Sequence, residues 1–415
     1  MKPIKFSIIF LLCLAALLLL PRTVSTHEPI TTTVMFNKEV IRILQRNCLG
    51  CHAPNKIKAD IPLTTYEEAR PWAKAIKEEV LEKRMMPFQA VKGYGNFQHD
   101  YTLPQRDVEL LVSWIEGGAP RGDVKDYPSE PIRQLIAGKA WSLGMPDLIL
   151  QPETETRIAA ESDGKEQCVS IPTGLKEDRF ISAFDFQPGN GAIVHSASFA
   201  IETKAAKQRC GPNFASIGQW APGQSAVRLP DGFGHRLPTG SRIVMKIRYR
   251  TNGEAATDHS RIGLYFAKSA PNKPIRNVAV APSPGAMIPA NDAAYRANAT
   301  LALAEQAEIV AIRPLLFPFA KSIEATAIRP DGTSEVLIWA KGYRYDWQPS
   351  YVFKKPVALP RGTRIEVTAW LDNSDDNPNN PNDPPAPVVL KAALCEIALA
   401  SAAPTKPTLL QQARR

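Results

Sequence analysis

The apolar pattern of this 415-residue chain changes at about Pro128, and that change constrains its fold more than any other feature. Between Val34 and Pro128 apolar residues recur at helix spacing, as at Val40, Ile43 and Leu44. After Pro128, short β-type runs alternate with Gly, Pro, Asn and Asp. The sequence therefore predicts a helical unit of about 95 residues followed by a β region.

The β region is too long for a single sandwich. It has about 275 residues, and the proline-rich segment 271–289 is a natural seam between two units. The predicted fold class is multidomain, with an all-α domain followed by two all-β, jelly-roll-like sandwiches. The predicted ranges are a signal peptide (1–26), the all-α domain (27–128), a linker (129–140), the sandwiches (141–270 and 271–403) and a tail (404–415).

The N-terminus has the pattern of a secretory signal. Lys2 and Lys5 precede an uncharged stretch at 6–20, and small polar residues follow it. The uncharged stretch has 15 residues, fewer than the roughly 20 that span a bilayer as a helix. We expect an exported, periplasmic protein cleaved near Ser25 or Thr26. The alternative is membrane association through an uncleaved N-terminus.

The charge balance is mildly basic. Loss of Lys2, Lys5 and Arg22 with the signal lowers the net charge from +9 to +6. Such a charge suits docking to an acidic partner or a membrane surface, or it reflects an ordinary solvated surface. No nucleic-acid partner is expected for an exported chain.

The strongest chemical signal is the sequence CLGCH at 48–52. Two thiols three positions apart can add to the two vinyl groups of a haem, and His52 then falls on the iron. The alternatives are a redox disulfide or half of a zinc site, but no second Cys pair follows at zinc spacing. The motif predicts covalently bound haem c, with Cys48 and Cys51 as the thioethers and His52 as an iron ligand.

A second axial ligand is expected on the other face of the haem. Met85 and Met86 precede Pro87 on a turn, and Met85 stands 33 positions after His52. Methionine opposite histidine is a known axial pair. We take Met85 as the candidate, Met86 as its alternative and His99 as a weaker one.

Five segments of the helical region form a family pattern. They are FNKEV at 36–40, CLGCH at 48–52, LTTYEEA at 63–69, GYGNF at 93–97 and WIEGGAP at 114–120. Together they resemble a family of bacterial c-type cytochrome domains, which implies an all-α, class I-like cytochrome c fold. In that family a Met-Pro-Pro-Trp element supplies the axial methionine. Its counterpart at 85–88 implies Met85 and departs at two positions, so Met86 stays open; Trp72 and Trp114 would line the haem or pack between helices.

The β region carries a series of turn motifs. They are QPGNGAIVH at 187–195, LPTGS at 237–241, the segment 258–266, PDG at 330–332, YDWQ at 345–348, LPRGT at 359–363 and DNS at 372–374. From about Trp141 onward the chain thus resembles the copper type II, ascorbate-dependent monooxygenases, the family of the peptidylglycine hydroxylating and dopamine monooxygenases.

That resemblance implies two coppers, one held by three His and the other by two His and a Met. Only His195 is retained among the corresponding positions. The other five positions carry residues that do not suit copper, namely Ser196, Arg248, Leu315, Phe317 and Ile397. We therefore expect no copper; a relocated site of His195, His235 and His259 is the alternative.

Three cysteines remain outside the signal and the CLGCH motif. Cys168 and Cys210 can pair in an oxidising compartment, with Cys395 left as a buried apolar residue, but the sequence does not fix the connectivity.

These features together predict an exported monohaem c-type cytochrome that transfers single electrons. A copper-free, monooxygenase-like β scaffold would serve docking or assembly, a redox protein of unknown identity would be the partner, and no catalytic residue is assigned. Two alternatives stay open: a copper monooxygenase fed by its own cytochrome domain, and a haem-linked ligand-binding sensor.

Overall fold

The computed structural model describes most of the chain. The described residues are 32–85, 89–138, 141–161, 164–203, 210, 214–251, 253–269, 271, 273–315, 318–342 and 348–401. The predicted signal peptide (1–26), the tail (404–415), Met86 and Phe317 lie outside them, as do parts of the linker and of the YDWQ motif. In the part of the chain that is described, no helix is long and apolar enough to cross a membrane.

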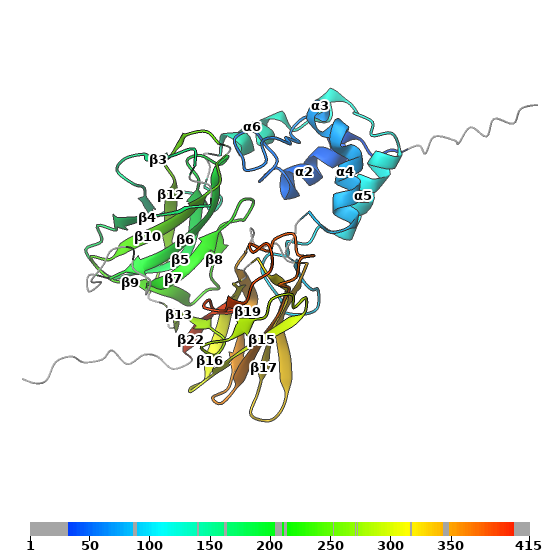
Figure 1. Cartoon of the computed structure of the whole chain (residues 1–415). Coiled ribbons are helices and arrows are strands. Elements are labelled where there is room, and N and C mark those ends of the chain that lie inside the picture. The colour runs from blue at the N-terminus through cyan, green and yellow to red at the C-terminus, as the bar shows by residue number, and fades with distance from the viewer. Residues whose placement is uncertain are drawn as a thin grey trace, which may run out of the picture.

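The described chain forms three lobes, one helical and two built from β-sheets (Figure 1). The helical lobe contains η1 (Phe36–Val40), α2 (Ile41–Asn47), α3 (Tyr66–Ala69), η2 (Arg70–Trp72), α4 (Ala73–Leu81), α5 (Gln105–Glu116), η3 (Val124–Asp126) and α6 (Ser129–Ala137). Thr65 caps α3 through a capping box with Glu68, and Gly138 ends α6 in the left-handed conformation. Trp114 is fully buried at the lobe's centre, and its indole Nε1 donates to the Pro120 carbonyl at 2.9 Å.

The first sandwich contains β2 (Leu148–Leu150), β3 (Thr156–Ile158), β4 (Glu166–Pro172), β5 (Arg179–Gln187), β6 (Val194–Glu202), β7 (Ala215–Trp220), β8 (Val227–Arg228), β9 (Phe233–Leu237), β10 (Arg242–Tyr249), β11 (Ala256–Asp258) and β12 (Arg261–Phe266). A four-stranded sheet in the order β4-β10-β6-β7 packs against the strands β9-β5-β12-β2. Phe184, Phe186 and Phe199 fill the core between them. Inward residues alternate along β6 and β10, as expected for strands with one face on a core.

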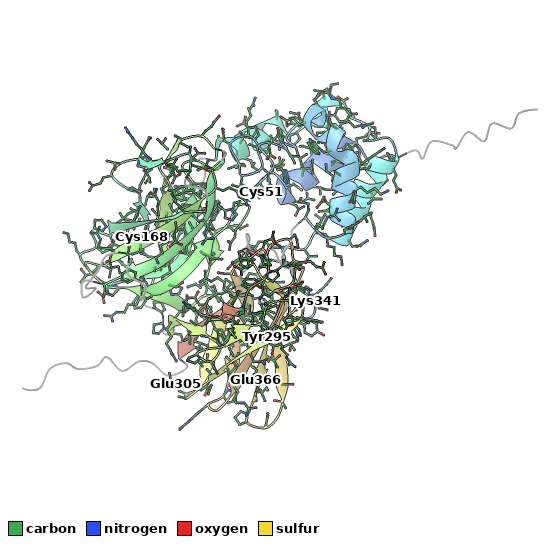
Figure 2. The ribbon with its side chains drawn as sticks, in the orientation of Figure 1. Cys51, Cys168, Tyr295, Glu305, Lys341 and Glu366 are labelled. Atoms are coloured by element: carbon green, nitrogen blue, oxygen red, sulfur yellow. A yellow bond between two sulfur atoms is a disulfide. The ribbon has the colours of Figure 1, made fainter. Side chains whose placement is uncertain are left out.

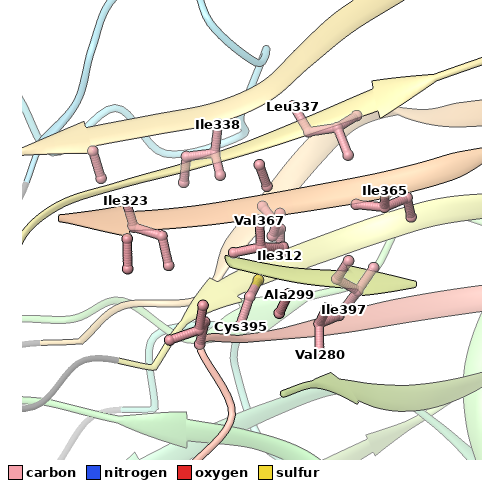
Figure 3. Close-up of a cluster of buried hydrophobic side chains, with 14 of the residues drawn as sticks. Val280, Ala299, Ile312, Ile323, Leu337, Ile338, Ile365, Val367, Cys395 and Ile397 are labelled. Carbon is pink, nitrogen blue, oxygen red and sulfur yellow. The ribbon is translucent and has the colours of Figure 1, made fainter. Parts of the chain in front are cut away.

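The second sandwich contains β1 (Gln89–Ala90), β13 (Lys273–Val280), β14 (Met287–Ile288), β15 (Tyr295–Ala302), β16 (Ala307–Pro314), β17 (Ala320–Ile328), β18 (Ser334–Lys341), β19 (Tyr351–Leu359), β20 (Arg364–Leu371), β21 (Val388–Val389) and β22 (Cys395–Ser401). A five-stranded sheet in the order β1-β18-β17-β20-β15 faces the strands β19-β16-β22-β13. Figure 3 shows their shared core, in which Ile323, Ile338 and Val367 pack toward Ile397 and Cys395.

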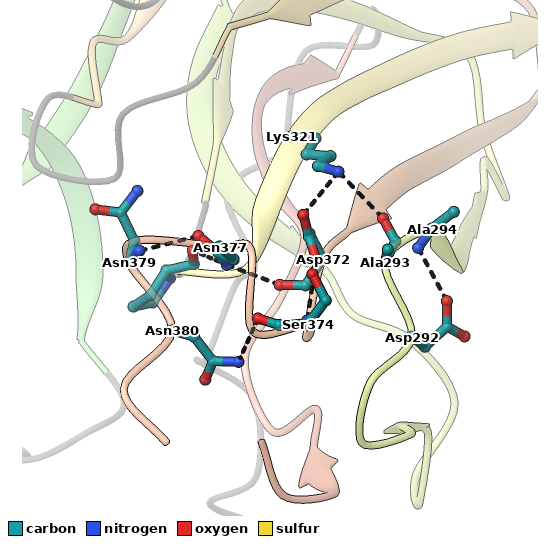
Figure 4. Close-up of polar contacts among 10 residues, drawn as sticks. Asp292, Ala293, Ala294, Lys321, Asp372, Ser374, Asn377, Asn379 and Asn380 are labelled. Atoms are coloured by element: carbon teal, nitrogen blue, oxygen red, sulfur yellow. Dashed lines mark hydrogen bonds and ion pairs between the residues drawn. The ribbon is translucent and has the colours of Figure 1, made fainter. Parts of the chain in front are cut away.

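The asparagine- and proline-rich loop after β20 is ordered by its own side chains (Figure 4). The buried Asp372 carboxylate lies 2.7 Å from the Lys321 ammonium and accepts the Ser374 amide at 3.0 Å. The Asn377 side chain donates to the Asp372 carbonyl at 2.7 Å. Residues 372–387 contain neither helix nor strand, because their prolines have no backbone N–H to donate to a sheet. The side-chain bonds order the loop instead.

One sheet runs through both sandwiches. β13 begins at Lys273, just after the predicted seam, and pairs parallel with β9 through Lys273 with Phe233 and Pro274 with Gly234. The strands β19-β16-β22-β13 of the second sandwich thereby continue into β9-β5-β12-β2 of the first. A small apolar cluster that includes Leu229 and Val310 packs at this crossing.

The prediction of an all-α, class I-like cytochrome c domain followed by separate sandwiches is wrong. The described chain is predominantly β with several sheets, and its longest helix, α5, has 12 residues. Residues 89–101 were predicted inside the all-α domain, but they belong to the second sandwich. Gln89 and Ala90 pair with Lys341 and Ala340 of β18.

The reason lies in the side chains of this segment. Phe97 packs its ring at 5.0 Å from Tyr351 and 4.8 Å from Phe353, both in the second sandwich. Gly93 and Gly95 have positive φ, which suits turns and interrupts any helix. The apolar residues of 89–101 are thus buried by a sheet, and the resemblance to a whole cytochrome c domain fails with them.

Candidate functional site

The CLGCH loop is a tight turn that continues the end of α2. The Cys48 amide donates to the Leu44 carbonyl at 2.7 Å, which extends the helix by one residue. The amides of Cys51 and His52 both donate to the Cys48 carbonyl, at 3.0 and 2.9 Å. Neither cysteine is in a disulfide. One turn of backbone therefore presents two thiols and an imidazole.

His52 is held in one tautomer. Its Nδ1 lies 3.0 Å from the Ile61 carbonyl, and because a carbonyl can only accept, Nδ1 carries the hydrogen. The Leu63 amide closes the same loop by donating to the His52 carbonyl at 3.0 Å. Burial lowers the pKa of His52, with Lys58 acting in the same direction. At neutral pH the imidazole is neutral, and its lone pair is on Nε2.

Cys48 is a protonated thiol in the folded chain. Burial, followed by the neighbouring Cys51 and Asp107, raises the pKa of the Cys48 thiol to about 12. Asp107 comes from α5 and forms an ion pair with Arg46 at 3.2 Å. The thiol hydrogen is thus retained at neutral pH.

The loop meets the first sandwich through glycines. A Cβ on Gly50 would lie 2.7 Å from the Gly223 Cα, so the two backbones touch where neither has a side chain. A Cβ on Gly223 would lie 3.4 Å from the Cys51 Sγ, and a Cβ on Gly191 would lie 2.5 Å from the Asn55 carbonyl oxygen. Figure 2 shows Cys51 on the side of the helical lobe that faces the first sandwich.

The donor set fits covalent haem better than a bare metal ion. Within the described residues no three or more His, Cys, Asp or Glu side chains converge on one point, so Cys48, Cys51 and His52 do not form a metal cage. Haem needs no such convergence, since the thiols bond to the edge of the macrocycle and the imidazole to its centre. A metal-binding His that donates its other ring N–H to a backbone carbonyl is the usual arrangement, and His52 has it.

The candidates for the second iron ligand lie between the end of α4 and the segment that packs on the second sandwich. Met85 follows α4, donates its amide to the Glu79 carbonyl at 3.3 Å, and has a side chain that is 37% exposed. Met86 lies outside the described residues. His99 is exposed on the segment that packs on the second sandwich. Trp114 packs between helices, whereas Trp72 is at the surface.

Those positions implied by the copper-enzyme resemblance that the structure describes do not form a metal-binding cluster. His195 lies on β6, next to Ser196, which pairs with Arg248 of β10. Ile397 is fully buried in the core of the second sandwich, and Leu315 follows β16.

The relocated copper site is not formed either. His235 is buried on β9, and burial lowers its pKa to about 4. His259 Nε2 lies 2.9 Å from the Pro152 carbonyl. The described residues hold no cluster that joins these two with His195.

The three remaining cysteines of the described chain form one disulfide and leave one free thiol. Cys168 and Cys210 form a disulfide in the first sandwich, and Cys395 is a buried free thiol on β22.

Sequence reasoning missed two groups of residues. The turn Ala221–Gln224 touches the CLGCH loop, and its only signal was a Pro-Gly pair between two strands. Arg313 on β16 and Glu396 on β22 form a largely buried ion pair on the face of the second sandwich that meets the first, and no local pattern marks them.

Comparison with known proteins gives no family. No protein-family model matches the chain, and no curated protein matches it. Among solved structures, N-glycanase F (PNGase F) is similar with a TM-score of 0.31 and 9% identity over 61% of this chain and 95% of that one. A CBM22 tandem domain of Paenibacillus barcinonensis Xyn10C has a TM-score of 0.18 and 11% identity over 64% and 95% of the two chains. At these scores neither likeness carries an argument about function.

The predicted function is corrected by the fold. Electron transfer by a monohaem cytochrome rested on an all-α cytochrome domain, and the described chain is predominantly β without one. The copper-enzyme and haem-sensor alternatives rested on the same two-part resemblance, and the described residues show no metal-binding cluster for the first. The identification with a cytochrome fused to a monooxygenase-like region is therefore withdrawn.

Proposed function

We propose that this chain is a covalent haem-binding protein, with Cys48 and Cys51 as the attachment residues and His52 as an iron ligand. The observation that carries the proposal is the hydrogen bond from His52 Nδ1 to the Ile61 carbonyl at 3.0 Å. It leaves Nε2 as the ligand atom on the same turn that presents the side chains of Cys48 and Cys51, neither of which is in a disulfide. The proposal depends on the CLGCH residues 48–52 and on the loop that carries Ile61, and it needs no class I-like cytochrome fold.

The attachment chemistry uses groups that the loop presents. Cys48 and Cys51 would each add across a vinyl group: a bond forms from Sγ to one vinyl carbon, the vinyl π bond breaks, and the thiol hydrogen ends on the other carbon. No oxidant is consumed. When bound, the haem would supply a redox-active iron; His52 would be one of its ligands, and Met85, with Met86 as the alternative, is our candidate for a second. Export to the periplasm, which the N-terminal pattern predicts, is part of the same proposal.

The test is expression of the full chain in a periplasm that contains a haem-attachment system. Intact-mass measurement and a haemochrome spectrum should show one covalent haem per chain. The double variant Cys48→Ala/Cys51→Ala should carry none. Cys395→Ala is the matched control, because it removes a buried free thiol elsewhere and should retain the haem.

Two results would contradict the proposal. One is a wild-type chain that gains no haem mass although the attachment system loads a reference protein in the same cells. The other is a wild-type chain with a Cys48–Cys51 disulfide in place of haem.

A further inference from the structure

The turn Ala221–Gln224 of the first sandwich lies against the haem-attachment loop, although about 170 residues separate the two in sequence. The turn follows β7 and is braced by its own side chain, since the Gln224 amide donates to the Ala221 carbonyl at 3.0 Å and the Gln224 Oε1 accepts the Ala221 amide at 3.1 Å. These two hydrogen bonds fix the conformation of the turn.

The contact between turn and loop is as close as backbones allow. Gly50 stands between the two attachment cysteines, and a Cβ there would lie 2.7 Å from the Gly223 Cα. Real Cβ atoms do not tolerate that distance, so glycine at this position is what permits the approach. On the other side of the contact, the Cys51 Sγ lies 3.4 Å from where a Gly223 Cβ would be.

A second turn of the first sandwich braces the same loop. Gly191 approaches the Asn55 carbonyl, three residues after His52. The Asn190 amide donates to Asp258 at 2.9 Å, which anchors this turn to the sandwich. The attachment loop is thus held between two turns of the same β lobe.

The turn also carries a buried donor without a partner. Gln224 is 8% exposed, and its side-chain Nε2 has no hydrogen-bond partner among the described residues. Tyr101, from the segment that packs on the second sandwich, lies next to the Gln224 side chain. A buried N–H left unpaired costs free energy unless a further group accepts it.

From this geometry, and resting on the proposed function, we propose that Ala221–Gln224 is a positioning segment of the haem site. The turn covers the Cys51 thioether, so that the haem lies in the joint between the helical lobe and the first sandwich. Attachment of the haem then holds that joint closed, and a side chain larger than a methyl group at Gly223 would press on the Cys51 sulfur.

Hydrogen exchange on the full chain tests the coupling. The haem-loaded wild type is compared with the unloaded Cys48→Ser/Cys51→Ser variant. Amides of 221–226 should exchange roughly tenfold more slowly in the loaded chain, because opening of the joint is suppressed. Amides around Gly240, in a turn on the same sandwich, should exchange alike in both. Equal exchange of 221–226 in the two proteins would overturn the inference.

A pair of glycine variants tests the position of Gly223. Gly223→Val and Gly232→Val both place a branched side chain on a turn of the first sandwich with positive φ, at 78° and 85°, so the backbone strain is matched. Only Gly223 has the Cys51 sulfur within 4 Å; Gly232 has no atom that close. Gly223→Val should shift the optical bands and midpoint potential of the bound haem, and Gly232→Val should leave both unchanged.

The outcomes separate the two proposals. A wild type without haem defeats the proposed function and, with it, this inference. A wild type with one haem whose spectrum and potential respond equally to both glycine variants defeats the inference alone. If Gly223→Val fails to accumulate, the exchange comparison still decides, because it uses no variant in the turn.

Discussion

The first sandwich makes two joints, one with the second sandwich and one with the helical lobe. The sandwich joint is made by backbone pairing of β9 with β13 and by buried side chains on both sides. The helical joint described above is made where Gly50 meets Gly223 and Gly191 meets Asn55. A continuous sheet and an apolar cluster stabilise the first by themselves. The second is made by close backbone contacts at glycines, so we expect it to depend more on what is bound beside it.

The sandwich joint also contains charge. The side chains of Arg313 on β16 and Glu396 on β22 form an ion pair and are only 12% and 14% exposed. Arg313 also donates to Gln219 on β7 of the first sandwich. The Asn277 side chain on β13 donates to the Ser216 carbonyl of β7 at 2.9 Å. The bonds to Gln219 and Ser216 cross from one sandwich to the other and fix the register of the joint.

Breaking that ion pair should have the largest effect. Glu396→Gln leaves Arg313 buried without its counter-charge, which typically costs about 3–5 kcal/mol in free energy of unfolding. Urea unfolding followed by intrinsic fluorescence measures the loss. Asp178→Asn is the matched control, because its partner Arg236 is 63% exposed and surface pairs contribute about 1 kcal/mol or less.

The double variant Arg313→Leu/Glu396→Leu sharpens the result. Replacing both charges removes the unpaired buried group, so stability should recover toward the wild type. A Glu396→Gln protein as stable as the wild type would mean that the sandwich joint does not depend on this pair.

The next effect concerns the segment 89–101. Phe97→Ala removes a half-buried ring from Tyr351 and Phe353 and should cost about 2–3 kcal/mol. The loss should appear in unfolding of the second sandwich, monitored by hydrogen exchange of β18 and β19. His99→Ala, an exposed neighbour, is the control. A loss of hydrogen-exchange protection confined to the helical lobe would instead show that this segment is stabilised by the helical lobe.

The same segment shows why sequence reasoning went wrong. Its glycines and aromatics match a cytochrome-like pattern locally, but the burial of Phe97 is decided by β19, more than 250 residues later in the chain. The spacing of Ile43 and Leu44 did indicate the helix at 41–47, because it places a complete apolar stripe on the buried side of that helix. A short segment without such a stripe takes its structure from whichever surface buries it.

The candidate site divides in a similar way. The CLGCH motif is local, so its thiols and imidazole could be found from spacing alone. The Ile61 carbonyl that fixes the His52 tautomer is backbone, which no side-chain pattern reveals. The contact of Gly223 with the loop depends on how two lobes pack together, and that packing cannot be predicted from sequence spacing.

A smaller effect should follow from filling the helical joint. Gly50→Ala places a methyl group 2.7 Å from the Gly223 Cα, so one backbone must move. Overpacking of this kind should cost roughly 1–2 kcal/mol. Limited proteolysis should cut between the helical lobe and the first sandwich faster than in the wild type, while the sandwich joint unfolds as before. Gly232→Ala, in open space, is the control. Unchanged cleavage would show that Gly50 does not set the approach.

The smallest expected effect is the pH dependence of the sandwich joint. His235 lies on β9 and lines a small cavity there with Asn277, Arg313 and Glu396. Burial lowers its pKa from 6.5 to about 4, so the folded chain resists the proton that the unfolded chain accepts. Stability from this residue is therefore complete above pH 6.5 and is lost as the pH falls toward 4. Between pH 7 and 5.5 the loss should be about 1 kcal/mol.

The variant His235→Gln isolates that contribution. It keeps a polar side chain in the cavity but cannot take up a proton in this range, so its unfolding free energy should lose about 1 kcal/mol less than the wild type between pH 7 and 5.5. His99→Gln, at an exposed histidine, should follow the wild-type curve. Because protonated His235 would add a positive charge beside Arg313, the weakening should centre on β9 and β13 in hydrogen exchange and leave the helical joint unaffected. Identical pH curves for His235→Gln and the wild type would show that acid does not weaken the sandwich joint through this residue.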